Sequence, residues 1–186
     1  MMNAGKVGDR VDADVVRGAQ SALGVAIAGH YEIECFDATG RLKWRETIDN
    51  LVVDVGLNDM LTQWLKGSTY TAAFYVGLVA GTPTIAAGDT MSSHAGWTDN
   101  ATYSNATRPA LTLGTVASKS VDNSASKAVF NINGSATITG AFVTTNSTKS
   151  GTTGTLISAG AFSGGSKSVT SGDTLNVQVT YTASST

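Results

Sequence analysis

Charge is almost absent from the last two-thirds of the chain, and this feature limits its fold more than any other. Residues 67–186 hold only 5 of the 12 basic and 4 of the 14 acidic side chains of the 186-residue sequence. Within residues 109–186, 29 of 78 positions are Ser or Thr. A region of Ser, Thr, Gly, Ala and Val with so little charge is typical of β-structure with a neutral exterior. A folded domain tolerates such a surface when much of it is covered in an assembly.

Alternation of apolar and polar residues predicts strands, because successive side chains of a strand point to opposite faces. In residues 174–182, Leu175, Val177, Val179 and Tyr181 form one face, and polar residues form the other. The other candidate strands span residues 30–37, 42–45, 72–80, 111–118, 128–132, 136–145 and 154–161. About eight strands with Gly-, Ser- and Asn-rich connections predict a mainly β fold, a β-sandwich or jelly roll.

The first two candidate strands are predicted to form a hairpin, with residues 38–40 as the turn. Glu32 and Glu34 share one face of the first strand. Two neighbouring carboxylates also suit a catalytic pair, but basic residues on the second strand favour a solvated, salt-bridged face. The basic residues expected opposite them are Arg41, Lys43 and Arg45.

One segment, residues 55–66, has the apolar spacing of a helix that packs one face on the core. Asp54 is the expected N-cap and Gly67 the expected C-terminal stop. The apolar stripe of this helix consists of Leu57, Met60, Leu61, Trp64 and Leu65. Such a stripe is more often a core face than part of a cofactor site.

A weaker helical pattern precedes the β region, in residues 12–23. We expect residues 1–29 to form an N-terminal arm and helix, and residues 30–186 to form one β-sandwich domain that includes the helix at 55–66. The arm helix packs on its own domain or docks on a neighbouring subunit. Its apolar positions are Val15, Val16, Ala19, Ala22 and Leu23.

The long segment from Thr84 to Pro109 holds the residue types that chemistry would need. Asp89, Ser93 and His94 have the side chains of a catalytic triad, but no G-x-S-x-G motif is present. A metal site of Asp89, His94 and Asp99 has no supporting spacing. We expect no catalytic residues, no metal and no cofactor, and we expect the loop to serve structure and partner contact.

Composition excludes several classes of protein. A net charge of −2 argues against direct binding of nucleic acid through broad positive charge. The longest apolar stretch, residues 22–29, is far shorter than the roughly 18 residues of a membrane span. No convincing secretory signal is recognised, so we expect synthesis in the cytoplasm. A glycan-binding module stays open as an alternative, with Trp97 and Tyr103 as the loop aromatics that would stack on sugar.

A set of short motifs resembles a group of small virion proteins of tailed bacteriophages, over roughly Tyr31 to Tyr181. The motifs are Tyr31-Glu32-Ile33-Glu34, Asp54-Val55-Gly56-Leu57-Asn58, Asp89-Thr90-Met91-Ser92-Ser93-His94-Ala95-Gly96-Trp97, Tyr103, Arg108-Pro109-Ala110-Leu111, Gly140-Ala141-Phe142, Gly154-Thr155-Leu156 and Gly172-Asp173-Thr174-Leu175-Asn176-Val177. The resemblance implies a structural protein: a capsid cement or decoration protein, or a neck or tail component.

We therefore expect a capsid cement protein, made in the host cytoplasm and placed on the capsid exterior, that bridges subunits of the major capsid protein. It is expected to form a symmetric dimer or trimer, because most soluble oligomers are symmetric. A neck, tail or fibre-associated adaptor of the virion is the alternative. The residues expected at interfaces are Val11, Val15, Ala19, Leu23, Met91, His94, Trp97, Tyr103 and Arg108.

Overall fold

A computed structural model describes residues 25–67 and 72–185. Within them the chain is mainly β with one α-helix, as the sequence predicts. The elements are β1 (Val25–Phe36), β2 (Leu42–Val52), α1 (Asp54–Leu65), β3 (Tyr75–Thr84), β4 (Ala95–Asn100), β5 (Ser120–Asp122), η1 (Ser124–Ser126), β6 (Ala128–Asn131), β7 (Ala136–Ile138), β8 (Gly140–Thr144), β9 (Leu156–Ala161), β10 (Lys167–Val169) and β11 (Thr174–Ser185).

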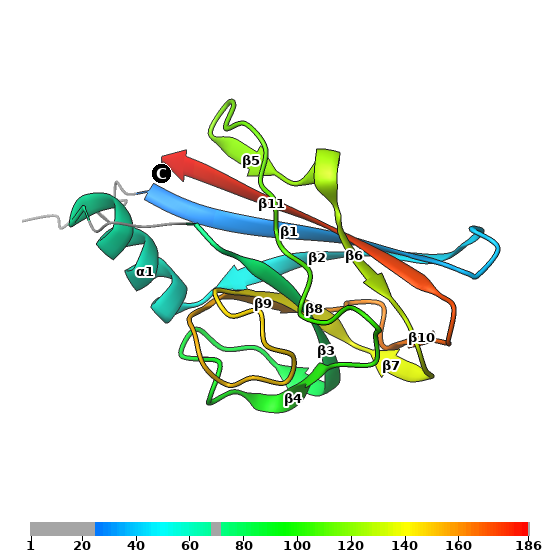
Figure 1. The fold of residues 1–186 in the computed structure, drawn as a ribbon. Coiled ribbons are helices and arrows are strands. Elements are labelled where there is room, and N and C mark those ends of the chain that lie inside the picture. Colours follow the sequence, from blue (N-terminus) through cyan, green and yellow to red (C-terminus); the bar gives the residue numbers. More distant parts are fainter. Residues whose placement is uncertain (1–24, 68–71, 186) are drawn as a thin grey trace, which may run out of the picture.

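Nine strands form one antiparallel sheet in the order β4-β3-β8-β9-β2-β1-β11-β5, with β6 also paired to β11. A separate two-stranded sheet joins β10 to β7. The long strands β1, β2 and β11 run together, and β3, β4, β8 and β9 gather below them (Figure 1). Strand β2 pairs with β1 and with β9, so it links the two halves of the sheet.

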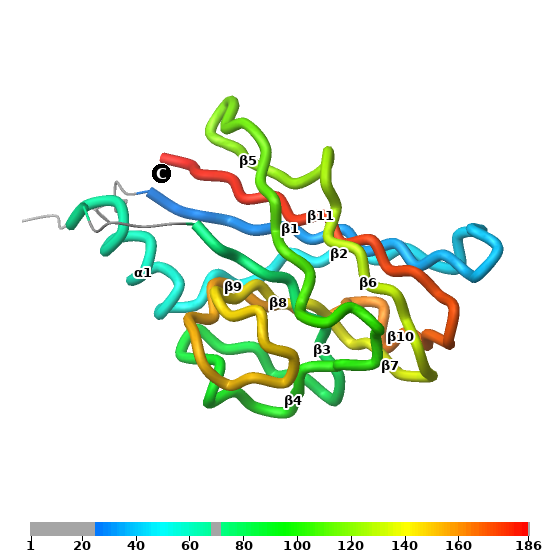
Figure 2. The backbone as a smooth tube through the Cα atoms, viewed as in Figure 1, coloured from blue at the N-terminus to red at the C-terminus, as the bar shows by residue number. Residues whose placement is uncertain are grey.

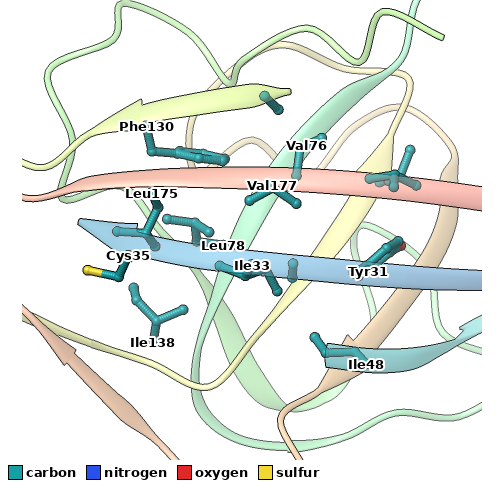
Figure 3. Close-up of a cluster of buried hydrophobic side chains, with 14 of the residues drawn as sticks. Tyr31, Ile33, Cys35, Ile48, Val76, Leu78, Phe130, Ile138, Leu175 and Val177 are labelled. Atoms are coloured by element: carbon teal, nitrogen blue, oxygen red, sulfur yellow. The ribbon is translucent and has the colours of Figure 1, made fainter. Parts of the chain in front are cut away.

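The main core lies between these two halves. Tyr31 and Ile33 of β1 and Val177 of β11 meet Val76 and Leu78 of β3 in one cluster of buried side chains (Figure 3). The alternation seen in the sequence explains this arrangement, since every second residue of each strand faces the cluster. A second, smaller cluster includes Val79, Trp97 and Phe142, so the first half of β3 is buried on both faces.

The predicted hairpin is confirmed: β1 and β2 pair from Phe36 and Leu42 outward. Other boundaries differ from the expectation. Strand β1 begins at Val25, so residues 25–29, expected in the arm, belong to the sheet. The strand predicted at residues 111–118 is wrong, because this segment runs in irregular conformation between β4 and β5 (Figure 2). The interface residues expected at Val11, Val15, Ala19 and Leu23 lie outside the described part of the chain.

Helix α1 begins one residue earlier than predicted, and Asp54 is not its N-cap. Val53 occupies the cap position in an extended conformation and makes no side-chain cap bond, so Asp54 is the first helical residue. The predicted stop is confirmed: Gly67 follows the C-cap Lys66 with a φ of +65°, which glycine adopts at little cost. Gly56 packs directly on β9, where an added Cβ would lie 2.4 Å from the carbonyl oxygen of Ile157.

Candidate functional site

The outward face of α1 is the most distinctive surface of the described chain. Trp64 is 84% exposed, Leu65 71% and Leu61 53%, and Leu57 is also exposed. Only Met60 of the predicted stripe packs against the core. The prediction that this stripe forms a core face is therefore wrong, and the helix presents most of its apolar side chains to solvent.

The packing of Gly56 explains the orientation of the helix. Gly56 and Met60 are four residues apart and share one side of α1, which lies on the sheet. Glycine allows the helix backbone to approach β9 so closely that this side, and not the side of Leu61 and Leu65, makes the contact. Leu61 and Leu65 then fall on the far side of the helix, whereas Trp64, four residues after Met60, is exposed in the last turn.

An apolar cavity of about 220 Å³ lies beside the same helix. Met60 lines it from α1, Ile27 from β1 and Tyr181 from β11, with Leu113 from the irregular segment between β4 and β5 and Val121 from β5. Helix α1 lies near the start of β1 and the end of β11 (Figure 1), and residues of all three elements line the cavity. Apolar groups therefore gather at one end of the molecule.

The loop residues expected at an interface lie mostly inside the protein. Met91, Trp97, Tyr103 and Arg108 are buried. His94 is partly exposed and stacks on Trp97, with 3.7 Å between ring centroids. Trp97 in turn packs against Phe142 of β8. Met91 and Trp97 belong to the second core cluster and Tyr103 to the main one, so these side chains are held inside the described fold, and their contact with a partner stays a prediction.

Arg108 is the largest fully buried side chain and holds three segments together. It bonds to the Asp99 carboxylate at 3.0 Å, to the carbonyl oxygen of Asn146 at 2.8 Å and to that of Gly151 at 3.0 Å. Burial raises the pKa of Asp99, although the amide of Ser150 and the charge of Arg108 act in the opposite direction. A basic residue in a nearly uncharged region was the sequence signal for this anchor.

The triad-like residues have structural contacts of their own. The Asp89 carboxylate accepts a hydrogen bond from the backbone N–H of Ala86. The backbone N–H of Ser93 donates to the hydroxyl of Thr90, and the His94 ring stacks on Trp97. Among residues 25–67 and 72–185, no three His, Cys, Asp or Glu side chains are grouped as metal ligands. These contacts fit a role in holding the loop.

Of the basic residues expected opposite the hairpin carboxylates, Arg45 forms the ion pairs, but Glu34 is buried and not solvated as predicted. Arg45 of β2 pairs with Glu34, its cross-strand neighbour in register, and lies 3.9 Å from Glu32. Lys127, which precedes β6, bonds to Glu34 at 2.9 Å. Hydrogen bonds from Arg45 and Lys127 lower the pKa of Glu34. Sequence reasoning missed Lys127 because it lies next to β6, a strand that reaches this face only by pairing with β11.

Comparison with known proteins gives no family or function for this chain. The described part of the chain contains no helix with the length and apolar character of a membrane span. No protein-family model, no curated protein and no solved structure matches this chain.

Proposed function

We propose that this chain is a structural protein of a tailed-phage virion, a capsid cement protein that bridges subunits of the major capsid protein from the capsid exterior. The motifs of residues 89–97 and 172–177 support the phage assignment by resemblance. The two halves of the sheet enclosing one core support a sandwich-type fold within this proposal. No catalytic step and no cofactor belong to it.

The outward face of α1 carries the proposal. Contiguous exposed apolar surface on a folded protein marks sites of interaction. Tryptophan is among the residues that contribute most to protein interfaces, and Trp64 is the most exposed member of a group that includes Leu57, Leu61 and Leu65. The sparse charge of the chain suits the same role, because a partner that covers a neutral surface removes few charged groups from water.

The loop of residues 84–108 contributes differently from the sequence expectation. Its buried anchors, Trp97 and Arg108, fix the backbone, and exposed Ser and Thr side chains such as Ser92, Ser93 and Thr107 form its surface. A rigid polar rim beside an apolar centre is the usual anatomy of an interface. Partner contacts of this loop are therefore assigned to its exposed hydroxyl residues.

A capsid-binding assay tests the proposal. The chain is mixed with capsids assembled from the major capsid protein of the same virion, and bound protein is quantified after sedimentation. Trp64→Ser is expected to cost about 2 kcal/mol or more of binding free energy, roughly a thirtyfold loss of affinity. Val116→Ser is the matched control, because Val116 is also apolar and exposed but belongs to the segment between β4 and β5 and not to α1. Equal binding of both variants would remove α1 from the interface.

The copy number of the chain in purified virions separates cement from a neck or tail adaptor. Cement proteins cover the capsid lattice and are present in far more copies than an adaptor at a single vertex. The glycan-binding alternative depended on Trp97 and Tyr103 as stacking residues. Both side chains are buried and offer no ring face to a sugar. A scarce chain located at the neck would replace the cement assignment with the adaptor.

A further inference from the structure

The inner face of the β1–β11 ladder extends beyond the core that covers it. The two strands pair in register over their whole length, from Phe36 with Thr174 to Val25 with Ser185. Inward positions of β1 are fully buried at Tyr31, half-buried at Ile27 and 76% exposed at Val25. Apolar side chains thus point inward at one end of the ladder, where the described chain does not cover them.

The cavity of about 220 Å³ lies at this uncovered end. Its lining includes Ile27, Met60, Leu113, Val121 and Tyr181. The hydroxyl of Tyr181 is engaged with Ser158 at 2.6 Å, so its ring, and not its polar atom, is available to the cavity. An apolar cavity of about 150 Å³ is enough to take up a molecule the size of benzene. This larger cavity has room for one or two aliphatic side chains.

We propose that the apolar side chains of residues 15–23 of the same chain fill this cavity. Only Gly24 separates Leu23 from the first residue of β1, and Ile27 of the lining lies two residues further on. Four residues of extended chain span at most about 14 Å, so Leu23 stays within short reach of the cavity. Gly24 supplies the conformational freedom that a reversal of the chain direction needs at this point.

The sequence of this segment suits the cavity. Val15, Val16, Ala19, Ala22 and Leu23 recur with helical spacing and form one apolar side, with Arg17 and Ser21 opposite. Small and branched side chains on one helix can enter an apolar cleft lined by larger ones. Attachment to β1 gives the segment a millimolar effective concentration, which a second copy or a separate partner reaches only at high protein concentration.

Hydrogen exchange of the purified, full-length chain tests the proposal without any capsid, so its outcome is independent of the proposed function. Amides of residues 15–23 are expected to exchange at least tenfold more slowly than an unstructured peptide of the same sequence. Leu23→Asp places a charge on the apolar side and is expected to abolish this protection. Ser21→Asp is the matched control, with the same charge on the opposite side, and is expected to retain it.

A second variant changes a residue that lines the cavity. Leu113→Asp is expected to remove protection of residues 15–23 while amides of β1 and β11 stay protected, which shows that the sheet is still folded. Exchange of residues 15–23 at the unstructured rate in the unaltered protein would overturn the proposal. Protection that disappears on dilution, together with a dimer by light scattering, would also overturn it, because the segment would then occupy the cavity of a second copy.

Discussion

At the scale of single residues, buried charge decides where the long loop lies. Arg108 is 0% exposed and donates to a carboxylate and to two carbonyl oxygens from the loop of residues 146–151. Its guanidinium also lies 5.1 Å from the centroid of the Phe142 ring, so the side chain is held by packing as well as by hydrogen bonds. A charge buried in this way is stable only while its partners are present.

Removal of the Arg108 charge is predicted to destabilise the fold strongly. Arg108→Met leaves the Asp99 carboxylate buried without its cation, which costs about 3–5 kcal/mol. The free energy of unfolding, measured by urea denaturation, checks this value. Arg41→Met is the control, because the Arg41 side chain is 83% exposed and its ion pair with Asp37 is expected to contribute little. Similar losses in both variants would contradict the anchoring role of Arg108.

The acid sensitivity of the fold is predicted to depend on Glu34. Hydrogen bonds from Arg45 and Lys127 lower its pKa in the folded protein, and an unfolded glutamate titrates near pH 4.3. The ion pairs therefore stabilise the fold fully above about pH 4.3, and this stabilisation is lost as the pH falls through the folded pKa.

Glu34→Gln should cost about 1–3 kcal/mol of unfolding free energy at pH 7 and flatten the dependence of stability on pH below about 5. Urea denaturation across a pH series measures both effects. Asp49→Asn serves as the comparison, since the Asp49 side chain is 97% exposed. If the stability of Glu34→Gln fell as steeply below about pH 5 as that of the unaltered protein, other carboxylates would control the acid sensitivity.

Sequence proximity decides which of these contacts could be predicted. Glu34 and Arg45 face each other across a short hairpin, so the alternation pattern and the turn were sufficient to place Arg45 among the three basic residues expected there. Lys43 bonds to Asp173 at 2.5 Å although 130 residues separate them. That pair depends on the docking of β11 beside β1, which no local pattern contains.

At the scale of elements, α1 shows what an apolar period does and does not determine. The spacing of apolar residues predicted the helix and its Gly67 stop correctly. It did not determine which side packs on the sheet, because that choice depends on the close approach permitted by Gly56. A sequence pattern identifies an apolar face without stating whether its partner is the same chain or another molecule.

Replacement of Gly56 by Ala is predicted to destabilise the protein, although Ala is normally preferred over Gly inside a helix. In an ordinary helix, Gly→Ala stabilises by about 1 kcal/mol. Here the added Cβ would lie 2.4 Å from a backbone oxygen of β9, so α1 has to shift, and we expect a net loss of about 1–3 kcal/mol of unfolding free energy. Asn58→Ala, at an exposed position of α1, is the control and should be neutral or slightly stabilising. Thermal unfolding of both variants checks the sign.

The outward stripe of α1 is predicted to matter little for folding. Trp64→Ser should change the free energy of unfolding by less than about 0.5 kcal/mol, because an exposed side chain loses no packing. Met60→Ser, on the packed side of the same helix, should cost about 2 kcal/mol or more. Chemical denaturation distinguishes the two. A large loss in Trp64→Ser would mean that the Trp64 side chain is covered within the protein.

At the scale of the whole molecule, the first and last strands of the described chain form the centre of one half of the sheet. Strand β11 pairs with β1 over twelve residues and also with β5 and β6. The sequence predicted both strands from their alternation but not their pairing, since Phe36 and Thr174 are far apart along the chain. The core between the two halves can close only when β11 is in place, because Leu175, Val177 and Val179 supply part of it.

This dependence predicts that folding is cooperative over the whole described chain. A chain ending after Val169 lacks β11 and should show no cooperative transition in urea. Strands β5 and β6 then lose the strand they pair with, β1 keeps only β2, and Tyr31 and Ile33 lose their cover. A chain ending after Thr182 keeps the buried part of β11 and is the matched control, with an expected loss of about 1–2 kcal/mol. Circular dichroism during urea titration measures both chains. A cooperative transition in the shorter chain would show that the β3-β4-β8-β9 half folds on its own, and the two halves would then have to be treated as separate folding units.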